Sequence, residues 1–165
     1  MEIRWMIRRD LPEVMAIENA SFDRPLPEAE LVNTLRSRNS IGMVVEDGDK
    51  VLGFMIYLLH KTSLEILNFA VHPDYRRQGI ATLMIDKLIS KLSKQRRERI
   101  LIAVNEHFSD AHKFFSSVGF RAIGTIIVEG ETFYTFEWEV LVKSFPKNRI
   151  AKFMQELLTE SEGDL

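Results

Sequence analysis

A short basic loop between two apolar runs carries the residue types best suited to chemistry in this sequence. Arg76, Arg77, Gln78 and Gly79 follow the apolar run of residues 69–71. Beyond the glycine, apolar residues recur at helical spacing: Ile80, Leu83, Met84, Leu88, Ile89 and Leu92. The first backbone amides of a helix have no partner within the helix, so they can bind an anion. The pattern predicts a phosphate-binding loop; an ordinary turn with two solvated arginines is the alternative.

Other kinds of reactive site are excluded by the residue types present. The chain has no cysteine, which rules out disulfides, thiolate metal ligands and cysteine nucleophiles. Its histidines show no metal-ligand spacing with a third ligand, so no metal site is predicted: His60, His72, His107 and His112. The net charge of -2, from 22 basic and 24 acidic residues, gives no overall field that would favour nucleic acid.

One group of basic residues stands out locally: Lys87, Lys91, Lys94, Arg96, Arg97 and Arg99. Cations near the C-terminal end of a helix complement its dipole, which explains the group without any partner. A docking patch for an acidic or ribonucleoprotein partner is the alternative.

With 165 residues, the chain is large enough for one domain that encloses a cofactor-sized groove. No apolar run approaches the roughly 20 residues of a membrane helix, and the N-terminal residues lack the apolar region of a signal peptide. Since nothing requires an oxidising compartment, we expect a soluble protein of the cytoplasm.

The loop needs a strand before it and a helix after it, and the hydrophobic pattern predicts both. Strands are expected at residues 3–8, 42–46, 51–60, 64–71, 100–104, 122–129 and 132–142. Helices are expected after a cap at Asp10 and at about 27–37, 79–95 and 110–117. Turn-rich residues 46–50 and 129–131 predict two hairpins. The order is therefore β-α-α-β-β-β-α-β-α-β-β, which indicates a mixed α/β fold.

The sequence changes character beyond residue 142. An apolar stripe at helical spacing runs along an otherwise charged segment: Ile150, Phe153, Met154, Leu157 and Leu158. We therefore divide the chain into a core of residues 1–142 and a C-terminal amphipathic helix with an acidic tail, residues 143–165. The stripe must be covered, either by the chain's own core or by a homodimer or partner contact.

The basic loop also carries a family resemblance. Arg76, Gly79 and Ala81 have the form Arg-x-x-Gly-x-Ala, which resembles the pyrophosphate-binding signature Gln/Arg-x-x-Gly-x-Gly/Ala of the GNAT acyl-CoA-dependent N-acetyltransferases. The flanking residues 70–76 and the later residues 114–120 are also typical of that family. Residues 17–25 are similar to the connection between the first two helices of the ribosomal-protein-alanine N-acetyltransferases of RimI type. That branch usually has tryptophan next, where this chain has Leu26.

The resemblance implies the GNAT fold, in which a splayed, mostly antiparallel central sheet is flanked by helices and admits acetyl-CoA. It implies that backbone groups of Phe69, Ala70 and Val71 pair with the pantetheine arm. It also implies that the amides of one loop hold the pyrophosphate: Arg77, Gln78, Gly79, Ile80, Ala81 and Thr82. The side chains of Arg76 and Arg77 can add positive charge there, or can be exposed loop residues.

The family's side-chain catalysts are not carried over. The RimI-type positions of the general-base glutamate, the cofactor-contacting asparagine and the tyrosine that protonates the thiolate hold Ala103, Phe108 and Phe115 here. An apolar residue cannot move a proton. Glu65 precedes residues 66–71 at a spacing that resembles the histone-acetyltransferase branch, where a glutamate deprotonates the amine through water. The resemblance therefore implies Glu65 as a substitute base.

Alternatives to Glu65 remain. Burial would raise the pKa of this carboxyl toward the range of a base at neutral pH, but Glu65 can also be an exposed acid at the start of a strand. The histidines are other candidates for the base. By residue type alone, Tyr57, Tyr75 and Tyr134 are candidates for the acid, and solvent can also protonate the thiolate.

The resemblance implies an N-acetyltransferase that moves an acetyl group from acetyl-CoA directly to an amine, without a covalent enzyme intermediate. The expected acceptor is a protein or peptide N-terminal amine, for example that of a ribosomal protein. Two alternatives stay open. One is a small-amine acetyltransferase for a polyamine, amino acid or antibiotic. The other is a catalytically impaired acyl-CoA-binding scaffold protein, which the loss of polar groups at Ala103, Phe108 and Phe115 would explain.

Overall fold

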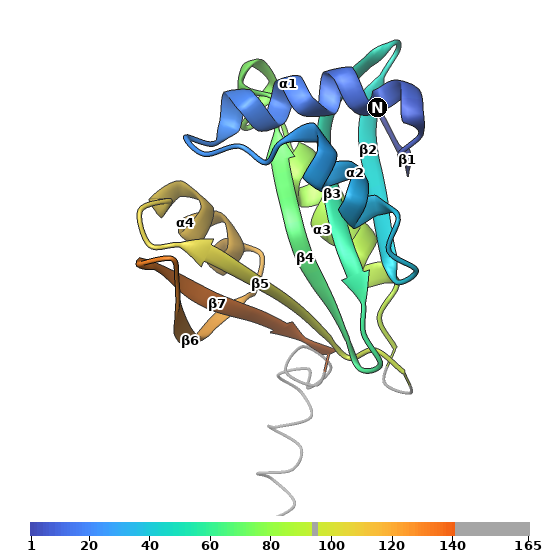
Figure 1. Cartoon of the computed structure of the whole chain (residues 1–165). Helices are drawn as coiled ribbons and strands as arrows, with labels where there is room; N and C mark the ends of the chain where they lie inside the picture. Colours follow the sequence, from blue (N-terminus) through green and yellow to red (C-terminus); the bar gives the residue numbers. More distant parts are fainter. Residues whose placement is uncertain (94–95, 141–165) are drawn as a thin grey trace, which may run out of the picture.

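The computed structural model describes residues 1–93 and 96–140 (Figure 1). Its strands form one sheet in the order β1-β2-β3-β4-β5-β7-β6. The strands are β1 (Glu2–Trp5), β2 (Ser40–Asp47), β3 (Lys50–Leu59), β4 (Ser63–Val71), β5 (Arg99–Asn105), β6 (Arg121–Val128) and β7 (Glu131–Glu139). The helices are α1 (Leu11–Ser21), α2 (Glu28–Leu35), α3 (Ile80–Ser90) and α4 (Ser109–Ser117), with short 3-10 helices η1 (Arg8–Asp10) and η2 (Pro73–Tyr75). The predicted order of elements and the mixed α/β class are confirmed.

The sheet divides between β4 and β5. Within the described strands this is the parallel pair, whereas the other neighbours run antiparallel. The parallel pairing extends only from Ser63 with Arg99 to Ile66 with Ile102, although β4 continues to Val71 alongside β3. Figure 1 shows β5 and β7 turning away from β4 beyond this point. The predicted splay of the sheet is therefore confirmed.

Helices cover the two faces of the larger half of the sheet. In Figure 1, α1 and α2 lie in front of β3 and β4, and α3 lies behind them. Ile17 of α1 and Leu31 of α2 pack in one apolar cluster with Phe54 of β3. Met84 of α3 belongs to a second cluster, which also includes Phe115 of α4. The apolar spacing that predicted these helices marks the side that each one buries.

The third helix is shorter than expected, which changes the explanation of the basic group. It ends at Ser90, with Lys87 in its last turn and Lys91 as its C-cap. These two lysines can complement the helix dipole. Arg97 lies beyond the helix, where its Nε donates a hydrogen bond to the His60 carbonyl at 2.8 Å. The dipole explanation therefore fails for Arg97, and for Arg99, which begins β5.

The first strand is also shorter than expected, since it ends at Trp5 and η1 begins at Arg8. Asp10, at the end of η1, links these elements. It is the N-cap residue of α1, yet its side chain makes no capping hydrogen bond there. Instead Oδ2 and Oδ1 accept hydrogen bonds from Arg4 at 2.8 and 2.9 Å, and Oδ2 also accepts one from the Ile7 amide at 2.8 Å. Asp10 is 3% exposed. These bonds tie β1 to the start of α1 through η1.

We expect Asp10→Asn to lower the free energy of unfolding by about 3 kcal/mol at pH 7, because the change removes the buried one of the two carboxylates that pair with Arg4. Arg4 and the Ile7 amide hold the pKa of Asp10 below its ordinary value. The carboxylate therefore stabilises the fold above the pKa of an unfolded aspartate, and this contribution is lost as the pH falls through the native pKa. Urea unfolding at pH 7 and at lower pH measures both effects.

Glu46→Gln is the control for that measurement. Glu46 contacts the same guanidinium at 2.9 Å, but its side chain is 25% exposed. We expect a smaller loss of stability, because solvent can replace the lost partner. Equal losses in the two variants would show that burial of Asp10 adds nothing.

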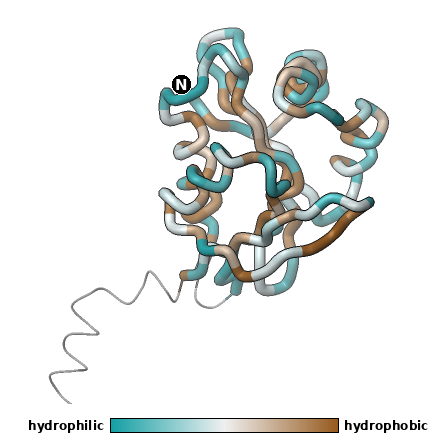
Figure 2. The backbone as a smooth tube through the Cα atoms, turned by 90° about the vertical axis from the view of Figure 1, so that its left-hand side faces the viewer, coloured by the Kyte–Doolittle hydropathy of each residue, from teal (hydrophilic) through white to brown (hydrophobic). Residues whose placement is uncertain are grey.

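The edge strand β6 is exposed along its whole length. Ile123, Ile126, Ile127 and Val128 are between 43% and 75% exposed. Figure 2 shows this hydrophobic run at its lower right, where it leads into the hydrophilic turn of the predicted second hairpin. The apolar edge is available for contact with another surface.

Two further predictions concern the C-terminal segment and membrane-spanning helices. The C-terminal helix expected within residues 143–165, its stripe and the homodimer contact proposed for it lie outside the described residues. In the part of the chain that is described, no helix is long and apolar enough to cross a membrane.

Candidate functional site

The predicted phosphate loop joins β4 to α3 through η2. Gly79 is the N-cap of α3, with φ +82° and ψ 7°, a left-handed conformation that glycine adopts at little cost. Arg77 is also left-handed, with φ +61°. A Cβ added at Gly79 would meet no atom within 4 Å. The backbone at the start of α3 therefore faces open space, where its free amides can meet an anion.

The two loop arginines differ in what their side chains do. Arg76 folds back: its Nε donates to the Val71 carbonyl at 3.1 Å, and its Nη2 donates to Oγ of Ser21 at 3.2 Å. Arg76 thereby ties the end of β4 to the end of α1. Arg77 is exposed, and no hydrogen bond or ion pair of its side chain is seen among the described residues. Arg77 is therefore the better placed of the two to add charge to the loop.

The strand before the loop has one backbone edge open to a ligand. Phe69, Ala70 and Val71 pair with β3 through Met55, Phe54 and Gly53. On their other side, the pairing with β5 has already ended at Ile66. The backbone groups along this edge can therefore pair with an extended polar chain, as the family resemblance implies for pantetheine.

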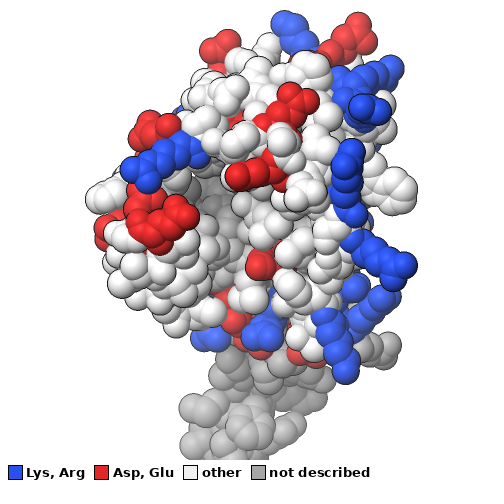
Figure 3. Space-filling model, in the orientation of Figure 1, with Lys and Arg blue, Asp and Glu red and all other residues white. Residues whose placement is uncertain are grey.

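A hollow lies between the two halves of the molecule. Figure 3 shows it between the smaller lobe, which carries α4, and the larger body, which carries α1 and α2. Aromatic rings meet across the split. Phe22, just after α1, lies 5.9 Å from Phe108, just before α4, measured between ring centroids. Phe69 of β4 lies 6.1 Å from Phe114 and 5.6 Å from Phe115 of α4. These contacts hold the lobes together around the hollow.

Phe115 stands where the RimI-type branch has the tyrosine that protonates the thiolate, and its packing explains why this position is apolar here. Its side chain is 3% exposed, and it packs edge-on against Phe114 and Phe120 with centroid distances of 5.2 Å. A hydroxyl at this ring would enter the apolar cluster between α4 and the sheet. The structure therefore places Phe115 in the core. Ala103, by contrast, is exposed on β5 opposite Thr135.

Glu65 lies at the point where the sheet begins to divide. It pairs with Leu58 of β3 and Leu101 of β5, one residue before the parallel pairing ends. Its side chain is 35% exposed, and its Oε2 is 3.4 Å from Nε2 of His60. The carboxyl is therefore half-buried, and not enclosed as the burial considered for it would require. Glu65 is instead an accessible acid at the base of the split, beside a histidine.

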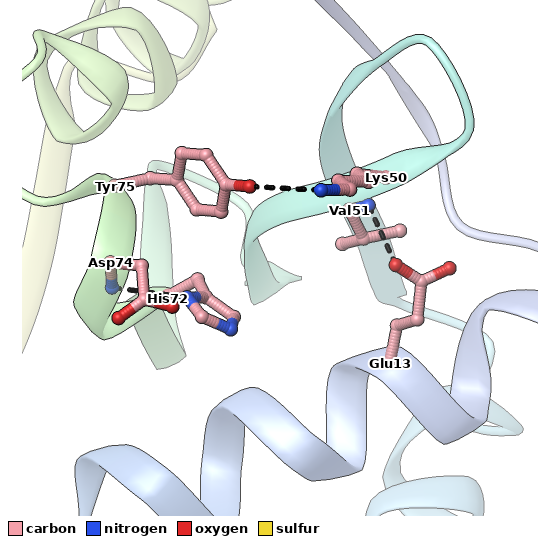
Figure 4. A pocket seen from close by; sticks show the side chains of 6 residues that line it. All are labelled: Glu13, Lys50, Val51, His72, Asp74 and Tyr75. Carbon is pink, nitrogen blue, oxygen red and sulfur yellow. Dashed lines mark hydrogen bonds between the residues drawn. The ribbon is translucent and has the colours of Figure 1, made fainter.

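The alternative acids and bases lie in several different places. Tyr57 is fully buried, and burial raises its pKa to about 12. His72 and Tyr75 line a cavity of about 270 Å³ between α1, η2 and the start of β3, shown in Figure 4. His112 binds the Asn105 carbonyl through Nε2 at 2.8 Å and contacts the edge of Tyr134. His60 is the candidate that lies next to Glu65.

Sequence reasoning missed Glu18, a buried acid near the end of α1. Glu18 is 2% exposed, and its Oε1 accepts a hydrogen bond from the Leu26 amide at 3.2 Å. Its Oε2 is buried with no hydrogen-bond partner among the described residues. Burial raises the pKa of this carboxyl. An acid in line with Val14 and Ile17 on the buried side of a helix was the signal that could have revealed it.

A match to a protein-family model decides the family of this chain. The acetyltransferase (GNAT) family model matches residues 10–120 of this chain. The chain belongs to the GNAT acetyltransferase family. A curated relative from Escherichia coli (strain K12), the [ribosomal protein bS18]-alanine N-acetyltransferase, is 27% identical over 112 residues, or 68% of this GNAT protein and 75% of the relative. The RimI-type resemblance is therefore confirmed.

Two solved structures share the fold. The crystal structure of Ard1 from Thermoplasma volcanium superposes with a TM-score of 0.76 at 23% identity, and covers 84% of this chain and 97% of its own. That of the Escherichia coli ribosomal-protein-S18-alanine N-acetyltransferase superposes with a TM-score of 0.74 at 21% identity, over 84% of this chain and 93% of its own. As a member of its family, the GNAT protein is an acetyl-CoA-dependent N-acetyltransferase, as predicted.

Proposed function

We propose that this GNAT enzyme transfers the acetyl group of acetyl-CoA to the α-amine at the N-terminus of a protein or peptide. The curated relatives named [ribosomal protein bS18]-alanine N-acetyltransferase support a protein acceptor over a small amine. The observation that carries the proposal is structural: an open strand edge on β4 leads into a left-handed glycine at the start of α3. These two features suit the pantetheine arm and the pyrophosphate of one elongated acyl-CoA molecule.

The proposed acetyl-CoA site uses mostly backbone groups. The open edge at Phe69, Ala70 and Val71 would pair with the pantetheine arm. The amides of residues 77–82 would hold the pyrophosphate: Arg77, Gln78, Gly79, Ile80, Ala81 and Thr82. The exposed Arg77 would add charge, whereas the Arg76 side chain would support the loop through its bonds to Val71 and Ser21. This division of roles refines the prediction for the two arginines.

The proposed reaction is a direct transfer. The neutral amine attacks the thioester carbonyl, a carbon–nitrogen bond forms, and the carbon–sulfur bond breaks with its electron pair leaving on sulfur. The proton lost by the amine passes through water to Glu65, which lies accessible at the base of the split. Solvent returns a proton to the thiolate. No cysteine is needed, and the chain has none.

The alternative function is that of an acyl-CoA-binding scaffold, which the apolar residues at two catalytic positions would explain. Phe115 is core and Ala103 is apolar, so neither can move a proton. An accessible carboxylate nearby, together with the enzyme names of the curated relatives, favours catalysis. A ribosomal protein as acceptor, and a cytoplasmic location suited to a chain without cysteine, belong to the same proposal.

The proposal is tested by acetyl-CoA consumption on a panel of peptide N-termini and small amines. We expect turnover on peptides, with a rate that rises with pH as more of the amine becomes neutral. A peptide that already carries an N-terminal acetyl group is the matched control and should not react. Measurable acetyl-CoA binding with no turnover on any amine would instead support the scaffold.

A further inference from the structure

Glu18, the buried acid on α1, lies between two parts of the molecule that face the split. Glu18 follows Val14 and Ile17 on the sheet side of α1, and both of these belong to an apolar cluster with Ala70 of β4. The carboxyl of Glu18 reaches the end of this cluster, within hydrogen-bonding reach of the Asn68 side chain. The contact between α1 and β4 is therefore apolar along Val14 and Ile17 and becomes polar at Glu18. This polar contact lies at the level of β4 where the open edge begins.

The first of these parts is the connection between α1 and α2, residues 22–27. Glu18 accepts a hydrogen bond from the Leu26 amide at 3.2 Å. The same connection carries Phe22, whose ring meets Phe108 of the other lobe at 5.9 Å. The connection is thus held at Leu26 by the larger body and touches the smaller lobe through Phe22. It forms one wall of the hollow seen in Figure 3.

The second part is an irregular point of β4. The register against β3 shifts between Ile56 and Tyr57, so that Asn68 pairs with Ile56 and Ile66 pairs with Tyr57. Leu67 is left as the extra residue, and it is 42% exposed. Such a bulge re-aims the strand. Asn68 directly precedes Phe69, the first residue of the proposed pantetheine edge, so Glu18 lies beside the point where acceptor and acetyl group would meet.

The hydrogen bonding of the carboxyl suits a positioning role. Its Oε2 makes no well-formed hydrogen bond in the described part of the chain, although the Asn68 side chain lies close to the carboxyl, and a buried charge with few partners is costly. Burial raises the pKa of Glu18 for the same reason. With or without a proton, the carboxyl has an oxygen that can accept the Leu26 amide.

We propose that Glu18 is a positioning residue, which holds the connection of residues 22–27 beside Asn68 and so builds the wall of the groove that takes the acceptor's N-terminal segment. This inference rests on the proposed function for its effect on acceptors. It also makes a purely structural claim, the ordering of Leu26.

Two substitutions separate positioning from proton transfer. Glu18→Gln has nearly the same size and keeps an oxygen for the Leu26 amide, so both kcat and the acceptor KM should stay within about twofold of the parent. Glu18→Met has similar volume and suits a helix, but offers no such acceptor. We expect it to raise the acceptor KM about fivefold to tenfold, as loss of one hydrogen bond would, with acetyl-CoA affinity unchanged.

The same variants have a readout that needs no substrate. Hydrogen exchange at the Leu26 amide should be slow in the parent and in Glu18→Gln, and about tenfold faster or more in Glu18→Met. Glu13→Met is the matched control. Glu13 is also on α1 and accepts a backbone amide, that of Val51 at 2.8 Å, but it does so at the cavity of Figure 4. This control should leave the acceptor KM and the exchange of Leu26 unchanged.

The outcomes distinguish the two claims. A parental acceptor KM and parental Leu26 exchange in Glu18→Met would overturn the positioning role. A loss of kcat by 100-fold or more in Glu18→Gln, with unchanged KM, would overturn it in favour of proton transfer. If the parent turns over no amine, the proposed function fails, and the exchange of Leu26 alone then decides whether Glu18 orders the connection.

Discussion

Gly79→Val is expected to weaken acetyl-CoA binding by about 100-fold, or about 2.7 kcal/mol. Gly79 begins α3 with a φ of +82°, which a β-branched residue adopts only with strain. The loop must then either leave this conformation or place two methyl groups in the open space before the α3 amides. In both cases the amides lose close access to the pyrophosphate. Calorimetric titration with acetyl-CoA measures the change.

A second glycine provides a control for backbone strain. Gly130, in the turn between β6 and β7, has a φ of +79° and likewise no atom within 4 Å of an added Cβ. Gly130→Val should therefore carry a similar strain, about 1–3 kcal/mol, and should bind acetyl-CoA like the parent. A folded Gly79→Val protein with parental affinity would show that the loop does not hold the cofactor.

The loop could be predicted because its structure depends on local sequence. A strand, a glycine and a helical pattern follow one another within residues 69–92, and the structure confirms each of them. The direction of an arginine side chain is a different matter. Arg76 bonds to Ser21, far away in sequence, because β4 and α1 end side by side. Pattern within the loop carries no information on that contact, so both arginines were predicted alike.

Burial of titratable groups was the least predictable part of the site. Glu65 stands in an apolar stretch, but the sheet divides directly beyond it, so its side chain stays 35% exposed. Glu18 stands in an ordinary helix, but its carboxyl is enclosed by the α1–α2 connection and Asn68. Exposure at both positions is decided by how distant segments come together. The resemblance predicted the divided sheet, and it did not predict which acids the division would expose.

Glu65→Gln is expected to lower kcat by at least about 100-fold at neutral pH, within the range of about 100-fold to 10,000-fold typical of general-base assistance. The carboxylate lies at the base of the split, and its exposure allows a water molecule to reach it. Acetyl-CoA affinity should stay nearly unchanged, because the proposed cofactor groups are backbone groups of residues 69–71 and 77–82. Part of the rate should return at higher pH, where the acceptor amine becomes neutral without help.

Glu98→Gln is a suitable control, because it removes the same charge from a half-buried acid just before β5. The backbone of Glu98 is engaged with Thr62 and Val140, and its side chain has no role in the proposed transfer. Its kcat should stay within about twofold of the parent, so that a change of overall charge cannot explain the loss at Glu65. The two variants should then differ most at neutral pH and converge as the pH rises. If Glu65→Gln turned over a verified peptide at the parental rate throughout this pH range, the proton would have to leave by another route, with His60, 3.4 Å from the same carboxyl, as the next residue to replace.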